Sequence, residues 1–205
     1  VADKFEKQTK DIRISNVRME NQGTMKFFGA ACSSLLIDGL YFHGNKTNLF
    51  SGEITAPKGQ NFKLEIRNSC FHQNTTGSAQ FFLVNNQTTY SDEREYSKVI
   101  LDNNIFYDTC QYQYGVYGIR FNGEKDSLYV TNNIFIAPNQ KYSIQPGDTG
   151  WFIGFSGTDK TPDEKLQQYV SDVVFRYNRF IGPIIPVDMS NVKNGTVWNF
   201  DYNYF

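Results

Sequence analysis

The chain has 205 residues, 40% of them hydrophobic and 20% charged, so it can build one sizeable core, and we expect a single domain over 1–205. The 20 basic and 21 acidic residues nearly cancel, which argues against nucleic acid as a partner. No apolar run reaches the ~20 residues of a membrane span, and the 13 Tyr and 18 Phe favour β structure.

The first ten residues, VADKFEKQTK, have neither the basic nor the apolar region of a signal peptide. The chain begins with Val and ends on an aromatic segment, and we therefore expect a processed product or a piece of a longer chain. Cys32, Cys70 and Cys110 lie far apart without metal-binding spacing, so we interpret them as packing residues.

Six segments along the chain superimpose without gaps: 35–45 (LLIDGLYFHGN), 63–74 (KLEIRNSCFHQN), 99–109 (VILDNNIFYDT), 128–138 (LYVTNNIFIAP), 173–183 (VVFRYNRFIGP) and 197–205 (VWNFDYNYF). Each has an apolar anchor, a polar turn pair and a Phe five positions after the anchor. The anchors are Ile37, Ile66, Leu101, Val130, Phe175 and Phe200, with Ile14 in a weaker seventh copy. Their spacings of 23, 29, 35, 29, 45 and 25 residues are typical of fixed coils with loops of varying length.

A second apolar stretch follows each anchor segment, starting near residues 25, 48, 79, 117, 151 and 185. We interpret it as another strand of each coil. Its alternation predicts Ile119 and Phe121 pointing inward and Arg120 pointing outward, with Gly154 and Asp188 in the same outward column.

The polar turn carries Asn at one repeated position, in Asn104, Asn133, Asn178 and Asn203. Asn tolerates left-handed backbone, and its amide can bond to the backbones of both neighbouring coils. The pattern predicts an asparagine ladder that serves the structure. Ser69, Leu40 and Val17 occupy the position in earlier coils, so we expect the ladder to be incomplete.

With its Asn-x-Phe turns (NNIF twice, YNRF and YNYF), the chain from Ile14 to Phe205 resembles the pectate-lyase-like superfamily. The resemblance implies an all-β fold, a right-handed parallel β-helix (solenoid) of about seven coils. Within the superfamily the chain is most similar to bacterial polysaccharide-utilisation proteins without an assigned activity. Ca²⁺ is implied by the resemblance alone, and the sequence itself indicates no cofactor.

Long insertions flank the second strand, and in the resembling family saccharide chains lie along that face. Thr161 to Glu164 form a capping box, which predicts a short helix at 162–169, either a lid or a cover for the coil edge. Nearby aromatic residues could stack on sugars or, alternatively, form an internal ladder. These candidate substrate-binding residues are Tyr112, Tyr114, Tyr117, Tyr142 and Trp151.

Cleavage of a uronate polymer by β-elimination needs a cation at the carboxylate and a base near the acidic carbon. Arg120 and Asp188 are the candidate catalytic residues. The outward column lacks the clustered carboxylates of a Ca²⁺ site and the paired acids of a glycoside hydrolase. His43 and His72 should stack in consecutive coils with Tyr107 next, without a carboxylate to complete a metal site, so we assign no metal ligands.

Two hypotheses follow. The first is a secreted or cell-surface β-helix that binds an acidic polysaccharide, with cleavage by β-elimination left open. The second is a non-catalytic structural or adhesive solenoid, whose open ends contact a parent chain or another copy.

Overall fold

The computed structural model describes residues 11–22, 25–31, 34–44, 48–55, 62–73, 80–85, 97–108, 117–122, 126–138, 151–155, 170–182, 185–188 and 197–205. Within these ranges every regular element is a β-strand. No helix in them is long and apolar enough to cross a membrane. The helix expected at 162–169 lies outside the described residues.

The first sheet contains the strands that carry the apolar anchors. In sheet order these are β1 (Asp11–Ser15), β4 (Ser34–Asp38), β7 (Phe62–Arg67), β10 (Ser97–Asp102), β13 (Asp126–Thr131), β16 (Val170–Arg176) and β19 (Val197–Asp201). All neighbours are parallel, and each anchor pairs with the next, from Ile14 with Ile37 to Phe175 with Phe200. The gap-free superposition of the repeats is therefore confirmed.

The second sheet contains the short strands that follow the polar turns. They are β2 (Arg18–Gln22), β5 (Tyr41–Gly44), β8 (Cys70–Gln73), β11 (Ile105–Asp108), β14 (Ile134–Ile136) and β17 (Arg179–Ile181), again parallel and in chain order. The repeated Phe residues occupy one register position, since Phe106 pairs with both Phe71 and Phe135.

The third sheet contains the second apolar stretch of each repeat. Its strands are β3 (Met25–Ala31), β6 (Asn48–Thr55), β9 (Gln80–Asn85), β12 (Tyr117–Asn122), β15 (Trp151–Phe155) and β18 (Ile185–Asp188). These are the stretches expected from the sequence to form strands.

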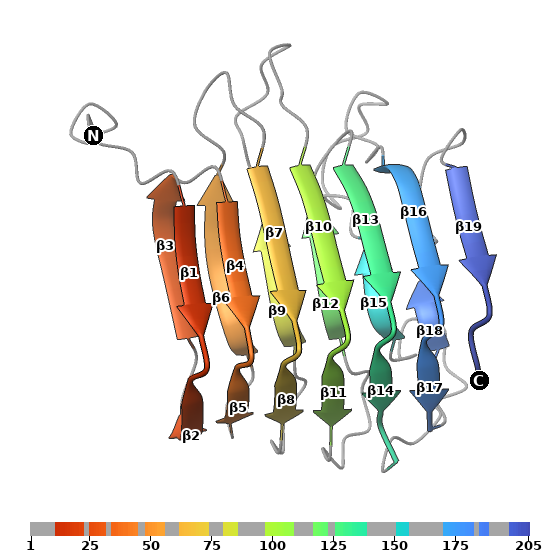
Figure 1. Cartoon of the computed structure of the whole chain (residues 1–205), viewed down its shortest axis with the longest axis horizontal. Helices are drawn as coiled ribbons and strands as arrows, with labels where there is room; N and C mark the ends of the chain where they lie inside the picture. The colour runs from red at the N-terminus through yellow and green to blue at the C-terminus, as the bar shows by residue number, and fades with distance from the viewer. Residues whose placement is uncertain are drawn as a thin grey trace, which may run out of the picture.

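Each strand thus pairs with strands three elements away in the chain, so consecutive strands belong to different sheets. In Figure 1 the β1-to-β19 sheet lies in front, the third sheet behind it, and the short strands of the second sheet continue below, with β1 and β19 at opposite sides of the view. The all-β fold with stacked parallel strands is consistent with a parallel β-helix.

The core lies along the axis on which the strands stack. Leu101, Val130 and Phe106 are at most 1% exposed, and neighbouring inward residues of the first two sheets, such as Leu128 and Phe135, are equally buried. The repeated phenylalanines form a continuous stack, with ring centroids 5.4 Å apart for Phe71 and Phe106 and 4.9 Å for Phe106 and Phe135. Such stacking adds to the burial of apolar area that stabilises each repeat.

The turn between the first and second sheets places its left-handed residue one position earlier than the sequence argument assigned it. Positive φ occurs at Asn16, Gly39, Asn68, Asn103, Asn132, Tyr177 and Tyr202, each directly before the ladder position. Attributing left-handed geometry to the ladder asparagines themselves was therefore wrong. Those residues are held instead by their side-chain hydrogen bonds.

Candidate functional site

The asparagine ladder uses every hydrogen-bonding group of its central amide. Asn133 Oδ1 accepts from the backbone N–H of Asn104 at 2.9 Å and from its Nδ2 at 3.0 Å. Asn133 Nδ2 donates to the Leu101 carbonyl at 2.8 Å and to Asn178 Oδ1 at 3.1 Å. The side chain is fully buried and satisfied, so its role is structural and it has no capacity left for catalysis.

The ladder also extends further than expected, because Ser69 takes part in it. The Leu40 N–H donates to Ser69 Oγ at 3.0 Å, and the Ser69 N–H donates to Asn104 Oδ1 at 3.0 Å. A hydroxyl oxygen therefore replaces the amide oxygen as acceptor. Sequence reasoning treated this position as a gap because it counted only asparagines.

Beside the ladder, a row of alternating charges crosses the first sheet at its turn end. Asp38 Oδ2 lies 3.0 Å from Arg67 Nη2, and Asp38 Oδ1 accepts from Asn68 Nδ2 at 2.9 Å. The Asn68 hydrogen bond, followed by the Arg67 hydrogen bond, holds the pKa of Asp38 below its usual value. Further along, Arg176 pairs with Asp201 at 3.2 Å. An ionised and occupied carboxylate such as Asp38 is a poor general base, so this row favours a structural role.

The two histidines stack as expected from their repeat positions. The rings of His43 and His72 are 4.4 Å apart, and those of His72 and Tyr107 are 4.7 Å apart. Partial burial, and to a smaller degree His43, lowers the pKa of His72. Nearly parallel rings do not direct their nitrogens at one point, which makes this stack a poor metal site. Within the described ranges, no three His, Cys, Asp or Glu residues form a group that could hold a metal ion.

Cys70, on the neighbouring column of the same sheet, is a half-buried free thiol. Burial raises its pKa, which disfavours the reactive thiolate. Cys32 and Cys110 lie outside the described residues.

The third sheet carries the candidate catalytic residues, which the structure places by backbone register. Arg120 of β12 pairs with Leu83 of β9 and with Gly154 of β15, and Gly154 pairs in turn with Asp188 of β18. Arg120 and Asp188 therefore occupy one column, two strands and about 10 Å apart at the strand spacing of parallel sheets. Lys26 belongs to the same column at its far end, through Ser51.

Two of the five candidate aromatic residues are brought together. Tyr117 of β12 pairs directly with Trp151 of β15, in the register position three residues before Arg120. Tyr112, Tyr114 and Tyr142 lie outside the described residues. Tyr117 and Trp151 lie side by side because β12 and β15 pair in parallel with no shift in register between them.

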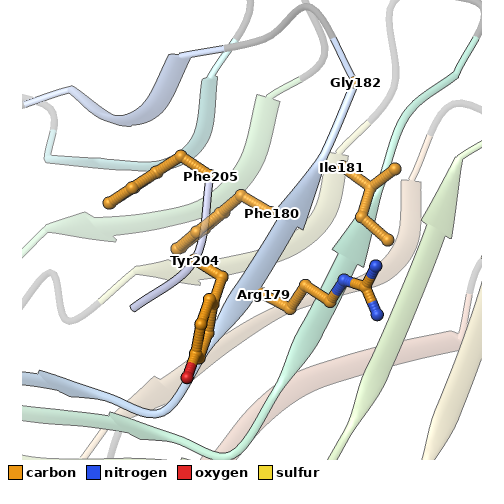
Figure 2. Close-up of a pocket in the computed structure, with 6 residues that line it drawn as sticks. All are labelled: Arg179, Phe180, Ile181, Gly182, Tyr204 and Phe205. Atoms are coloured by element: carbon orange, nitrogen blue, oxygen red, sulfur yellow. The ribbon is translucent and has the colours of Figure 1, made fainter. Parts of the chain in front are cut away.

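Sequence reasoning did not locate a hollow at the β19 end of the molecule. It has a volume of ≈ 610 Å³ and is lined by Arg179, Phe180, Ile181, Gly182, Tyr204 and Phe205. Figure 2 shows the Phe180 and Phe205 rings side by side, whereas Arg179 and Ile181 point to the opposite side of β17. The exposed aromatic end of the last repeat was the signal that could have indicated it.

In comparisons with known proteins, no family model, curated protein or solved structure matches the chain. Any function proposed for the chain therefore has to follow from the arrangement of its own residues.

Proposed function

We propose that this chain is a right-handed parallel β-helix of about seven coils, of the pectate-lyase-like type. We propose further that it is secreted or displayed at the cell surface and binds an acidic polysaccharide along its third sheet. The observation that carries the proposal is the shared column of Arg120, Gly154 and Asp188. Glycine between the two charged residues leaves room for a ligand group against the backbone.

The chemistry of the column suits an anionic polymer that crosses several strands. In the alternation expected from the sequence, Arg120 offers a planar pair of donors to a uronate carboxylate. Tyr117 and Trp151, three positions earlier, share the alternation of Ile119 and Ile153, which the sequence predicts to face inward, so the proposed contact with the polymer is made by the charged column and not by these two rings. Asp188 would stand about 10 Å from Arg120 as a candidate base, so elimination would require a sugar unit that spans both residues.

The test is binding and turnover with matched charge variants. Arg120→Ala should weaken retention on pectate, alginate or chondroitin about tenfold, the loss typical of one charge-assisted hydrogen-bonded pair. Lys98→Ala removes a positive charge from the first sheet, where Lys98 lies over the Tyr129 ring, and should leave retention unchanged. Absorbance of unsaturated products reports whether the bound polymer is also cleaved.

A glycan array without any bound ligand would contradict the binding proposal. Equal losses for the Arg120 and Lys98 variants would reduce it to non-specific charge attraction. Binding without unsaturated products would support a carbohydrate-binding function. It would contradict the lyase activity and the catalytic roles of Arg120 and Asp188.

A non-catalytic structural or adhesive solenoid is the second candidate, and one observation favours it. Tyr177 and Tyr202 stack with ring centroids 5.1 Å apart on the outside of the turns and are 55% and 69% exposed. Exposed aromatic residues grouped in this way are typical of contact surfaces between proteins. Light scattering would show self-association if another copy covers these rings.

A further inference from the structure

Two of the described turns hold a tyrosine where the others hold asparagine or glycine. Tyr177 and Tyr202 have φ of 58° and 55°, a left-handed backbone geometry that is unfavourable for a bulky side chain. The same turn position in the other coils carries residues that accept this geometry readily, namely Asn16, Gly39, Asn68, Asn103 and Asn132. Tyrosine is therefore a poor choice for the turn itself, and backbone strain of this kind is typical of positions that serve a ligand.

One ring face of Tyr177 is left open by the change in side-chain size along this row of turns. The Tyr177 and Tyr202 rings stack with centroids 5.1 Å apart and an angle of 6° between their planes, so Tyr202 covers one face. The opposite face is directed along the stack toward Asn132, whose backbone N–H donates to the Arg176 carbonyl at 3.0 Å. An asparagine side chain is too short to cover a tyrosine ring, and Tyr177 is 55% exposed. The step from Asn132 to Tyr177 therefore leaves a flat apolar surface beside an amide.

The amide at the floor of this step is held in a fixed orientation. Asn132 Nδ2 donates to Asp102 Oδ1 at 2.8 Å, and Thr131 Oγ1 donates to the same oxygen at 2.6 Å. Among the described side chains only Asp102 bonds the Asn132 amide, which leaves the amide oxygen and the second N–H for a ligand. A ligand on the Tyr177 ring thus meets an oriented group that can both donate and accept.

The charges around the step select against an anionic ligand. The two arginines of the neighbouring row are paired, Arg67 with Asp38 at 3.0 Å and Arg176 with Asp201 at 3.2 Å. Within the described residues Asp102 has no cation at ion-pair distance, so it adds negative charge beside the step. An ammonium group would use the acceptors but not the amide N–H, whereas a hydroxyl uses both. An uncharged ring with one apolar face and several hydroxyls, which is a neutral sugar, matches all of these groups.

We propose that Tyr177 and Asn132 bind a pyranose unit of a neutral saccharide. The apolar face of the sugar packs on the open face of the Tyr177 ring at about 4 Å. Because neighbouring coils are about 4.8 Å apart, the sugar then lies above Asn132, where its hydroxyls bond the Asn132 amide and the Asp102 carboxylate. This site is at the turn between the first and second sheets and does not depend on the Arg120 column. It gives the adhesive candidate a class of ligand.

Affinity gel electrophoresis in uncharged polysaccharides tests this site separately from the Arg120 column. The probes are dextran, a soluble β-glucan and galactomannan, and we expect at least one of them to retard the unaltered chain. Tyr177→Asn restores the residue type of the preceding turns and should weaken this retention about tenfold without lowering the melting temperature. Asn132→Gly should weaken it about fivefold, the loss typical of one neutral hydrogen bond. No retardation by any of the three polysaccharides would overturn the proposal.

Tyr202→Asn is the matched control, because the residue type, the turn position, the positive φ and the substitution are the same. It removes the ring behind Tyr177 but not the open face, so retention should stay within about threefold of the unaltered chain. Equal losses in Tyr177→Asn and Tyr202→Asn would overturn the assignment to the open face of Tyr177. Self-association that Tyr177→Asn abolishes, measured by light scattering, would show that a second copy covers the ring and would also overturn the proposal.

Discussion

At the scale of single residues, the turn asparagines show how a parallel stack satisfies buried polar groups. Asn104, Asn133 and Asn178 each donate to a backbone carbonyl of the preceding repeat and to the side-chain oxygen of the next ladder asparagine, as Asn178 does with Val130 at 2.7 Å and with Asn203 at 2.9 Å. One side chain thus joins three successive coils. Removing it leaves several buried groups without partners, which costs more than the loss of one bond.

Replacing a central ladder residue should therefore be severe. Asn133→Leu leaves the Asn104 N–H and the Leu101 carbonyl without their amide partner, and we expect the free energy of unfolding to fall by about 3 kcal/mol. The measurement is urea denaturation followed by circular dichroism. Asn132→Gly is the matched control, because Asn132 is exposed and has φ 57°, a geometry that glycine adopts freely. The control should change stability by about 0.5 kcal/mol or less, and a similar loss in both variants would contradict the structural role of the ladder.

At the scale of elements, the repeat determined what could be predicted. The anchor column from Ile37 to Phe200 and the phenylalanine column from Phe42 to Phe205 were predicted because their five-residue separation never varies between repeats. Parallel pairing without a gap then fixed the neighbours of Arg120 from its position alone. Where the repeat is regular, aligning the repeats with one another in the sequence also identifies the residues that pair between neighbouring strands.

Features that depend on side-chain chemistry rather than on the period were harder to predict. The left-handed turn position was misplaced because Asn tolerates that geometry and occurs at both turn positions, as in Asn103 and Asn104. Ser69 was not counted in the ladder because its hydroxyl imitates only the acceptor half of an amide. Tyr112, Tyr114 and Tyr142, which are in insertions outside the repeat, stay predictions.

The histidine stack of β5 and β8 makes a pH-dependent contribution to stability. The pKa of His72 is lowered from the usual 6.5, chiefly by burial, so the unfolded chain binds a proton more readily than the folded one. Stability is therefore full above about pH 6.5 and decreases as the pH falls toward the folded pKa of His72. Asp38 also has a lowered pKa, and the stability that its carboxylate contributes is lost only as the pH falls below about 3.8, the usual pKa of the group. This range is separate from that of His72 and more acidic.

His72→Gln should flatten the dependence of unfolding free energy on pH between about 7 and 5, the range in which histidine titrates. His43→Gln removes only the smaller of the two causes, so a His72 contribution should persist in that variant. Denaturant titrations at several pH values measure both slopes. An unchanged slope in His72→Gln would show that the stack does not sense protons.

At the scale of the whole molecule, the proposed solenoid makes the cost of a substitution depend on its place along the axis. Each repeat touches mainly its two neighbours, so an inner repeat is supported from both sides and an end repeat from one. Phe106 is stacked between Phe71 and Phe135 and is 0% exposed, whereas Phe205 contacts Phe180 alone in the phenylalanine stack and is 80% exposed. The same side chain at the same position of the repeat therefore meets two different environments.

We expect Phe106→Ala to lower the free energy of unfolding by about 4 kcal/mol, the usual cost of a large cavity in a close-packed core. Phe205→Ala should cost less than about 1 kcal/mol, since it loses one partly solvated ring contact. Denaturation curves of the two variants, compared under identical conditions, measure the difference. Amide hydrogen exchange should show the end repeats opening before the middle ones. Equal losses of stability in the two variants would mean that the phenylalanines do not form one axial stack. In such a stack the Phe106 ring is covered on both faces and the Phe205 ring on one, so their removal must differ in cost.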